Sequence, residues 1–401
     1  MYINSYKLTN FSSFKKIKNI FHKSSKKEIV SSIKSNKSIK KDENDFRIAY
    51  ILSGFPTLSQ TFVLNELRYL VKNGYDVKVF AYRDPMDPVN LDFNLEVIRF
   101  DKSEDLMSNL ENLLIDYKID LVHTHFVYPP CTNFTFPVCE KLHIPFTVFA
   151  HAVDIFVKEI DEKNRVGEIG QSKYCKGIFT LGDYHKNYLI ERGVPEDKIV
   201  ITKQATDYDI FPLKKTNNKI KKIVSISRFV EKKGINVLID AAKLLENEEV
   251  EFGIYGFGDL EDSYKNQIQS LNIKNIEVKG VLNGPREVKD LFDNSDLLVS
   301  PCVIASNGDR DGFPTVIFES MAYGVPVITT NVSVIPEVIK DGKNGFIVPS
   351  NNPNELALKI KEVMGYDDEE LFKIRQQAQI DVQNTSSVEK TMNILIGIWK
   401  D

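Results

Sequence analysis

Short apolar segments alternate with amphipathic helical segments along this chain, and the alternation runs through two successive series. The first series has apolar segments at 46–52, 76–80, 120–126, 145–151, 177–181 and 198–204. The second series has them at 222–227, 251–255, 276–281, 297–300, 325–329 and 346–348. Short apolar strands separated by helices are typical of a parallel sheet covered on both faces. The sequence therefore predicts an α/β protein with two Rossmann-like, doubly wound domains that face each other across a ligand cleft.

Changes in composition place the domain boundaries. A polar linker at 214–221 separates the two series, so we expect an N-terminal domain over 46–210 and a C-terminal domain over 211–380. The segment 368–400 has a helical pattern, and we expect its last part, 381–401, to pack back on the N-terminal domain.

Residues 1–45 differ from the rest in charge. They carry eleven lysines against four acidic residues, which gives +7, so the remainder of a chain with net charge −4 must carry −11. Apolar residues recur at helical spacing between Phe11 and Phe21, interleaved with lysines. Two interpretations stay open: a solvated, disordered tail, or a basic amphipathic stretch on an anionic membrane surface. The acidic remainder argues against nucleic-acid binding, which depends on neutralising phosphates.

Other features of the composition exclude further classes of protein. No stretch approaches the roughly 18 apolar residues of a membrane-spanning helix, and the N-terminus lacks the apolar core of a secretory signal. The four cysteines, Cys131, Cys139, Cys175 and Cys302, show no CxxC spacing, which argues against a disulfide framework or a thiolate zinc site. We therefore expect a protein of the cytoplasm.

Two acidic residues, Asp311 and Glu319, flank the start of a predicted helix in the second domain. Gly312 and Pro314 open this helix, and proline suits a first helical turn because its missing N–H is not needed there. A helix N-terminus is a natural site for a phosphate. The N–H groups expected to face it belong to Phe313, Thr315 and Val316. Glu319, about two turns along, would instead accept hydrogen bonds from a ribose, and Asp311 would hold hydroxyls of another sugar.

The segment from Asp311 to Glu319 resembles the E-x7-E signature of the retaining GT-B glycosyltransferases of family 4, with Asp311 in place of the first glutamate. The likeness is greatest to the exopolysaccharide branch, of the colanic acid and amylovoran types. Three further segments resemble that family: 227–234 matches its Arg-x4-Lys-Gly element, 55–66 its first loop and helix, and 149–154 its donor-sugar histidine segment.

The resemblance implies a retaining hexosyltransferase and a role for each matched residue. Asp311, with the backbone from Gly312 to Thr315, would hold the transferred sugar, while Glu319 would hold the ribose. Arg228 and Lys233 would clamp the donor diphosphate, because preorganised cations favour the charge that develops on the leaving group. The remaining implied contacts are His151 with the sugar near its anomeric carbon, Val281 with the base through its main chain, Gly54, Phe313 and Pro314 with the donor, and Thr57 and Glu66 with the acceptor.

The resemblance also implies the partners. The donor would be a UDP- or GDP-sugar, and the acceptor a glycan or a lipid-linked molecule in surface polysaccharide or glycoconjugate synthesis. Peripheral contact with the inner face of the plasma membrane is an expectation from the charge of residues 1–45 and not from the resemblance. No obligatory cofactor, no metal and no nucleic acid would be needed.

Some alternatives remain at the level of the sequence. Asp309-x-Asp311 and Asp207-x-Asp209 both spell a metal-binding D-x-D motif, and His123 and His125 share one face of a strand. A zinc site there would need a third ligand, and none is evident nearby in the sequence. The alternative functions are a sugar-nucleotide epimerase on the same fold and a non-catalytic, nucleotide-sugar-binding scaffold.

Overall fold

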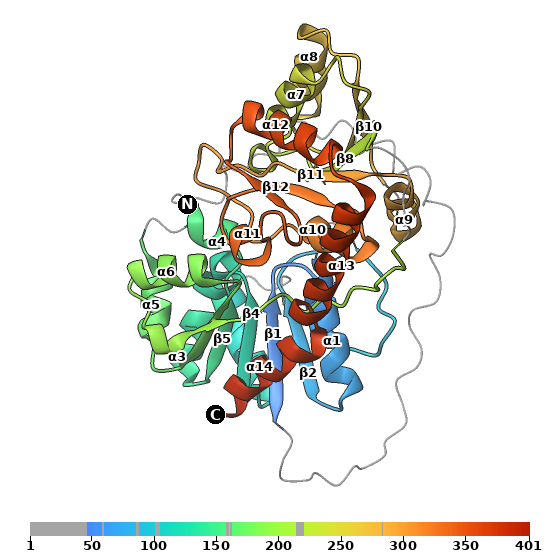
Figure 1. Ribbon diagram of the computed structural model, residues 1–401. Helices are drawn as coiled ribbons and strands as arrows, with labels where there is room; N and C mark the ends of the chain where they lie inside the picture. The colour runs from blue at the N-terminus through green and yellow to red at the C-terminus, as the bar shows by residue number, and fades with distance from the viewer. Residues whose placement is uncertain are drawn as a thin grey trace, which may run out of the picture. The chain divides into compact units, whose positions relative to one another are not determined.

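The computed structural model describes residues 46–401 except 58–59, 86–87, 101–104, 158–159, 161–162, 214–219 and 283. Residues 1–45, and with them the predicted tail, lie outside the described part. The described residues form two parallel sheets, each with helices on both faces (Figure 1). The predicted architecture of two Rossmann-like domains is confirmed.

The N-terminal sheet has seven strands in the order β3-β2-β1-β4-β5-β6-β7. They are β1 (Arg47–Leu52), β2 (Asp76–Ala81), β3 (Val97–Arg99), β4 (Leu121–His125), β5 (Phe146–Phe149), β6 (Cys175–Thr180) and β7 (Ile199–Ile201). The central strands are buried along almost their whole length, which explains why they are apolar without alternation.

The helices of the N-terminal domain divide between the two faces of this sheet. They are α1 (Thr61–Lys72), α2 (Leu106–Asp116), α3 (Phe136–Leu142), α4 (Val153–Phe156), α5 (Arg165–Gln171) and α6 (Asp183–Glu191), with short helical turns η3 (Val127–Thr135) and η4 (Glu196–Lys198). One face packs on α1 through residues such as Tyr50 and Leu67. The opposite face packs on α2, α3 and α5 through residues such as Val122 and Val138.

The C-terminal sheet has six strands in the order β10-β9-β8-β11-β12-β13. They are β8 (Lys222–Arg228), β9 (Glu251–Phe257), β10 (Ile276–Gly280), β11 (Leu297–Ser300), β12 (Val327–Thr330) and β13 (Phe346–Val348). The elements around them are η5 (Glu231–Lys233), α7 (Ile235–Leu244), α8 (Glu261–Ser270), α9 (Pro285–Asp293), α10 (Thr315–Tyr323), α11 (Ile335–Val338), α12 (Pro353–Met364) and α13 (Asp368–Thr385), and the last helix along the chain is α14 (Val388–Lys400). The helices α7, α8 and α12 cover one face, and α9, α10 and α13 cover the other.

Strand order reverses direction once in each sheet, between β1 and β4 and between β8 and β11. In doubly wound sheets, ligands bind outside the carboxyl ends of the strands at such switch points. We therefore expect a ligand to bind at the loops that follow β1, β4, β8 and β11.

Two elements differ from the sequence prediction. Strand β3 was not predicted, because it has only three residues and lies half-buried at the sheet edge. The helical pattern over 368–400 is divided into α13 and α14, and the break falls at Ser386 and Ser387. Both serines are extended, and the Ser387 side chain caps α14 by accepting a hydrogen bond from the N–H of Lys390.

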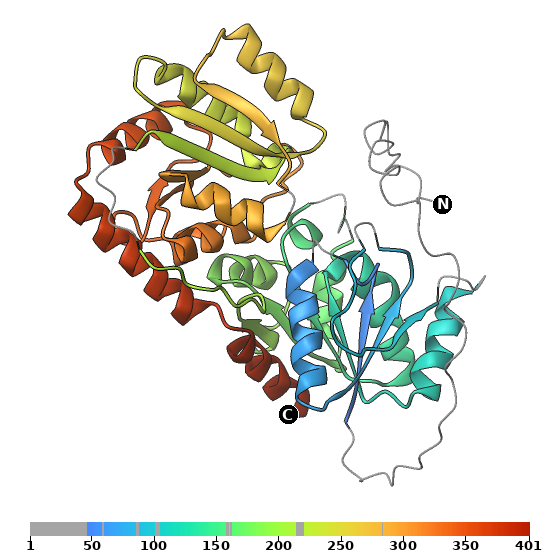
Figure 2. The same ribbon diagram turned by 90° about the vertical axis from the view of Figure 1, so that its right-hand side faces the viewer.

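Helix α14 packs on the N-terminal domain beside α1 (Figure 2). Its largest residue, Trp399, is 1% exposed. The Trp399 indole donates a hydrogen bond to Thr147 Oγ1 at 3.0 Å, and its ring meets the rings of Tyr50 and His123. The end of the chain is therefore part of the N-terminal core.

The main chain passes between the domains twice, and the two passages are joined. The first runs through 202–213 and the second through 385–388. The Asp207 carboxylate accepts a hydrogen bond from the N–H of Val388 at 2.9 Å, and Thr391 Oγ1 donates to the carbonyl of Lys203 at 3.0 Å.

A second set of contacts between the domains surrounds the N-terminus of α6. The Glu337 carboxylate accepts hydrogen bonds from the N–H groups of Asp183, at 2.9 Å, and Tyr184, at 2.8 Å. Glu337 therefore caps a helix of the other domain. Arg310 stacks over the ring of Phe156, with 4.5 Å between its guanidinium carbon and the ring centroid.

Candidate active site

A buried cluster of lysines and carboxylates lies after β8 and β11. Lys233 Nζ donates to Asp311 Oδ2 at 2.6 Å, and these side chains are only 14% and 11% exposed. Lys232 Nζ lies 3.1 Å from the Asp309 carboxylate and 3.7 Å from that of Asp311. The thiol of Cys302 also donates to Asp311, at 3.4 Å. The cluster therefore joins the loop after β8 to the loop after β11.

In this cluster, the lysines and the Asp311 carboxylate each stabilise the ionised form of the other. Burial alone would raise the pKa of Asp311, but the Lys233 and Lys232 charges hold that pKa below its usual value. Burial would likewise lower the pKa of Lys233, but the Asp311 charge raises it. Both groups are therefore ionised at neutral pH. Burial raises the pKa of the Cys302 thiol to about 12, so it stays protonated.

Gly234 allows the approach of these two loops. It adopts φ +63°, and a Cβ at this position would lie 2.0 Å from the carbonyl oxygen of Pro301. Only glycine fits both the left-handed backbone and the close contact. This contact explains why the Arg-x4-Lys-Gly element of the chain ends in glycine at position 234.

Helix α10 presents its N-terminus beside this cluster. Pro314 takes the N-cap position with an extended backbone, so the helix begins at Thr315, one residue later than predicted. Pro314 provides no side-chain cap, so within the described part of the chain the first N–H groups of α10 are available to an anion. A small pocket lies beside this helix N-terminus, between residues of α10 and its preceding loop on one side and residues of the first domain and its crossover on the other. Its lining residues are Leu181, Lys203, Gln204, Thr206, Tyr208, Phe313, Thr315, Phe318 and Ser386.

Gly312 brings this loop against the N-terminal domain. A Cβ at position 312 would lie 2.6 Å from Leu181 and 3.0 Å from the carbonyl oxygen of His151. Asp311 and His151, predicted from separate halves of the sequence, are therefore brought to neighbouring backbone positions.

Glu319 lies on α10, half-buried and without a cationic partner among the described residues. Burial raises its pKa, against the smaller effect of a hydrogen bond from the Thr315 hydroxyl. A partly buried carboxylate whose pKa is raised by burial does not stabilise the fold, so Glu319 is a candidate for binding a ligand.

Arg228 and Val281 are the least engaged of the predicted residues. Arg228 ends β8 and is exposed, and its side chain makes no hydrogen bond or ion pair within the described part of the chain. Val281 follows β10 and is 53% exposed. Gly54 follows β1 and is buried, where a Cβ would lie 2.8 Å from the carbonyl of Asp84.

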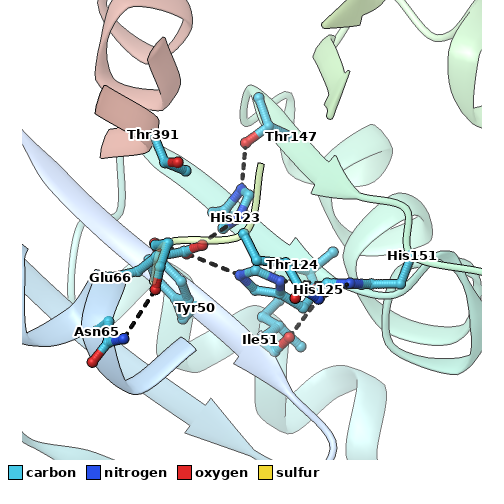
Figure 3. A network of polar contacts seen from close by, with 12 residues as sticks. Tyr50, Ile51, Asn65, Glu66, His123, Thr124, His125, Thr147, His151 and Thr391 are labelled. Carbon is cyan, nitrogen blue, oxygen red and sulfur yellow. Dashed lines mark hydrogen bonds and ion pairs between the residues drawn. The ribbon is translucent and has the colours of Figure 1, made fainter. Parts of the chain in front are cut away.

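On the N-terminal side, Thr57 is 4% exposed and pairs in an isolated bridge with Pro88. Glu66 on α1 is completely buried and accepts hydrogen bonds from Tyr50 and His125, each at 2.9 Å (Figure 3). Glu66 therefore has no exposed surface with which to contact an acceptor, and it reaches the site only through His125.

The expectation that His123 and His125 have no third ligand nearby is wrong. Glu66, His123 and His125 each offer a ligand atom, and these atoms lie within 4.8 Å of one another. Sequence spacing missed this grouping because Glu66 lies on α1 and both histidines on β4. Among the residues that the structure describes, Glu66 Oε1 and His123 Nε2 have no hydrogen-bond partner, whereas both ring nitrogens of His125 are engaged.

The two D-x-D motifs have other partners. Asp309 and Asp311 pair with Lys232 and Lys233, and the Asp207 carboxylate caps α14. A divalent ion at 309–311 would have to displace a lysine, so the arrangement suits an anionic ligand better than a cation.

Family models match both halves of the chain. The description "Glycosyltransferase Family 4" matches residues 59–210, and "Glycosyl transferases group 1" matches residues 209–380. The two matches meet where the first domain passes into the second. The chain is a GT-B glycosyltransferase.

Curated relatives and solved structures agree with this assignment. The chain is 25% identical over 391 residues to the putative colanic acid biosynthesis glycosyltransferase WcaL of Escherichia coli, which covers 84% of this chain and 95% of the relative. It is 24% identical over 362 residues to the amylovoran biosynthesis glycosyltransferase AmsK of Erwinia amylovora, covering 78% and 89%. The crystal structure of Anabaena Alr3699/HepE in complex with UDP-glucose has the same fold, with a TM-score of 0.69, 17% identity and coverage of 88% and 98%.

Sequence reasoning missed several residues of this glycosyltransferase site. Lys232 adjoins Lys233 in the sequence, and spacing alone could not show that both reach the 309–311 loop. Asp154 accepts hydrogen bonds from the N–H groups of His151, Ala152 and Val127, although burial raises its pKa to about 6. It thereby fixes the backbone of the His151 loop.

The described part of the chain contains no helix with the length and apolar character of a membrane span.

Replacing Glu319 by Gln should stabilise the glycosyltransferase at neutral pH while weakening nucleotide binding. Because burial raises the pKa of Glu319 in the folded state, its ionisation costs stability above that pKa and costs nothing below the unfolded value. The melting temperature of Glu319→Gln should therefore exceed that of the wild type at pH 7–8, and the difference should shrink as the pH falls towards about 4.5. Loss of a charged hydrogen-bond acceptor should weaken nucleotide binding by about 10- to 100-fold. Melting curves across pH and calorimetric titration with UDP and GDP test both effects, and a lower melting temperature at pH 7 would contradict the first.

Proposed function

We propose that this glycosyltransferase transfers a hexose, with retention of anomeric configuration, from a UDP- or GDP-sugar to a glycan or lipid-linked acceptor during exopolysaccharide synthesis. The biosynthetic setting is supported by the colanic acid and amylovoran relatives. A uridine donor is supported by the UDP-glucose complex of the Anabaena protein.

The observation that carries the proposal is the Lys233–Asp311 pair beside the uncapped N-terminus of α10. A diphosphate at that helix N-terminus would meet free N–H groups and the positive end of the helix dipole. Lys233 would then move from Asp311 to the phosphate, which frees the Asp311 carboxylate to accept hydrogen bonds from the sugar hydroxyls.

The other residues take roles that follow from their positions. Glu319, further along the same helix, would accept hydrogen bonds from the ribose. Arg228 would supply a second positive charge to the leaving diphosphate, and the main chain at Val281 would meet the base. His151, whose pKa is held well below its usual range by burial, would be neutral, and because its two ring nitrogens contact His125 and Gln204 it would act on the sugar through Gln204.

This arrangement supports a mechanism without an obligatory cofactor. Lys232, Lys233 and Arg228 supply the positive charge that a leaving nucleotide diphosphate requires as it departs. Front-face attack needs no protein nucleophile, because the leaving phosphate oxygen accepts the proton of the acceptor hydroxyl. We therefore propose that transfer proceeds in the presence of EDTA.

The lysine-rich residues 1–45 give a reason to propose peripheral contact with an anionic membrane surface, where a lipid-linked acceptor would lie. Co-sedimentation with anionic vesicles of the full chain and of a chain without these residues tests this contact. Equal binding of the two would remove the role of residues 1–45.

A donor panel tests the function. Purified protein is incubated with UDP-, GDP-, ADP- and TDP-sugars, and nucleotide release is measured beside an Asp311→Ala/Glu319→Ala variant. We expect one or two UDP- or GDP-sugars to release nucleotide slowly even without acceptor, and the double variant to release none. The proposed donor site is wrong if no donor turns over and no nucleotide sugar raises the melting temperature.

A further inference from the structure

A chain of hydrogen bonds runs from the buried face of α1 to the pocket beside α10. Glu66 Oε2 contacts His125 Nε2 at 2.9 Å, and His125 Nδ1 contacts His151 Nε2 at 3.0 Å (Figure 3). His151 Nδ1 then contacts the side-chain amide nitrogen of Gln204 at 3.3 Å. Gln204 lines the pocket that Phe313 and Thr315 also line. The chain thus connects Glu66, which has no exposed surface, with a small pocket that shares Phe313 and Thr315 with the place proposed for the sugar donor.

The chemistry of the groups gives this chain one direction. Glu66 Oε2 accepts the hydrogen bond of the Tyr50 hydroxyl, so it acts as an acceptor towards His125 as well, and His125 then carries its proton on Nε2. His125 Nδ1 is then an acceptor, and His151 must donate from its own Nε2. His151 Nδ1 is in turn left with a lone pair, which accepts from the amide N–H of Gln204. The carbonyl oxygen of Gln204 therefore remains for the pocket.

The surroundings hold His151 in place. Its ring packs against the rings of Phe62, Phe126 and Phe149, with centroid distances of 4.9, 4.4 and 4.8 Å. Asp154 binds the N–H of His151 itself, so the backbone is fixed as well. With the ring fixed, the hydrogen-bond properties of His151 depend on its tautomer, and the tautomer depends on Glu66.

We propose that Glu66 and His125 are positioning residues that hold His151 in the tautomer with its proton on Nε2, and that His151 thereby orients the Gln204 amide so that its carbonyl oxygen accepts a hydrogen bond from a sugar hydroxyl of the donor. The role of Gln204 rests on the proposed function. The tautomer of His151 does not, because it is a property of the protein alone.

The first experiment measures that tautomer without any substrate. Long-range nitrogen–proton NMR spectra of the full chain labelled with 15N-histidine distinguish protonated from bare ring nitrogens, and a His151→Gln variant assigns the His151 signals. We expect His151 to show a proton on Nε2 and none on Nδ1. A proton on Nδ1 of His151 would overturn the proposal whether or not the protein proves to be a transferase.

Matched variants at Glu66 then separate positioning from packing. Glu66→Gln keeps an oxygen acceptor for His125, whereas Glu66→Met keeps the volume and removes the acceptor. Tyr50→Phe accompanies the Met variant, so that no buried hydroxyl is left without a partner, and is also made alone as a control. We expect Tyr50→Phe and Glu66→Gln to keep the tautomer, and Tyr50→Phe/Glu66→Met to mix the two forms. Equal spectra for the Gln and Met variants would show that Glu66 only fills space, and if the Met variant does not fold, His125→Gln replaces it.

Activity and binding provide the remaining measurements. We expect Tyr50→Phe/Glu66→Met to raise KM for the sugar nucleotide by about 3- to 10-fold, because Glu66 acts on the sugar only through His151 and Gln204. Gln204→Met should raise KM for the sugar nucleotide by about 3- to 10-fold without changing the affinity for free UDP or GDP, because only the sugar meets Gln204. His123→Asn, which lies outside the chain of hydrogen bonds, serves as the neighbouring control with near wild-type KM for the sugar nucleotide. Stoichiometric transition metal in the purified protein would also overturn the proposal, because His125 Nε2 cannot hold both a metal and a proton.

Discussion

Replacing Lys233 by Met is expected to lower kcat for sugar transfer by about 10²- to 10³-fold, the loss seen when one preorganised charge-stabilising group is removed. Lys233 is buried, charged and hydrogen-bonded to Asp311, so it is held ready beside the proposed diphosphate site. Because its role is to stabilise charge on the leaving group, kcat should fall more than the affinity for the nucleotide. Steady-state kinetics with the donor identified in the panel provide the measurement.

The same substitution should also destabilise the fold, and a double variant separates the two effects. Removing one partner of a buried ion pair typically costs about 3–5 kcal/mol, because the other charge is left without compensation. Lys232, 3.7 Å from Asp311, should limit the cost to the lower end of that range. Lys233→Met/Asp311→Asn removes both charges, so we expect it to recover most of the lost stability while remaining inactive. Wild-type kcat in Lys233→Met would show that Lys233 does not contact the leaving group.

Replacing Trp399 by Ala should cause the largest loss of stability of any single change considered. Trp399 is 1% exposed, and removal of a large buried aromatic side chain typically costs about 3–5 kcal/mol. Its hydrogen bond to Thr147 is lost as well, which leaves one fewer partner for a hydroxyl that also contacts His123. Thermal and denaturant unfolding of the full chain measure the effect.

Ile394 provides a control for Trp399 on the same helix. It is 40% exposed, and Ile394→Ala should change the free energy of unfolding by no more than about 0.5 kcal/mol. Trp399→Phe keeps most of the buried area and loses the indole donor, so it should cost about 1 kcal/mol. Equal melting temperatures for the wild type and Trp399→Ala would mean that α14 is not docked in solution.

The sequence predicted the fold well because its strands are apolar along their whole length. Strands such as β4 and β11 are buried on both faces and were located to within a residue at each end. The pattern failed where burial is partial, as in β3, and where two serines interrupt a helical periodicity at 386–387. Both failures reflect local exposure or capping, which periodicity does not record.

The two halves of the site differ in how far sequence predicts them. Asp311, Gly312 and Glu319 lie within one short segment, so their grouping is local and could be inferred from spacing. The chain from Glu66 through His125 and His151 to Gln204 joins α1, β4 and two loops, and only the strand order brings these residues together. A buried carboxylate placed by topology cannot be distinguished, in sequence, from a carboxylate on the surface of a helix.

The bond between Asp207 and Val388 has a mechanical consequence for the two domains. The two interdomain crossings of the main chain are held together by this hydrogen bond. The domains can therefore rotate about the crossings as a hinge, whereas sliding or twisting of one domain against the other is resisted. Any such rotation that separates Glu337 from α6 strips two N–H groups of their acceptor. We therefore expect one main motion between the domains, a hinge rotation that the hydrogen bonds of the Glu337 carboxylate to α6 restrain.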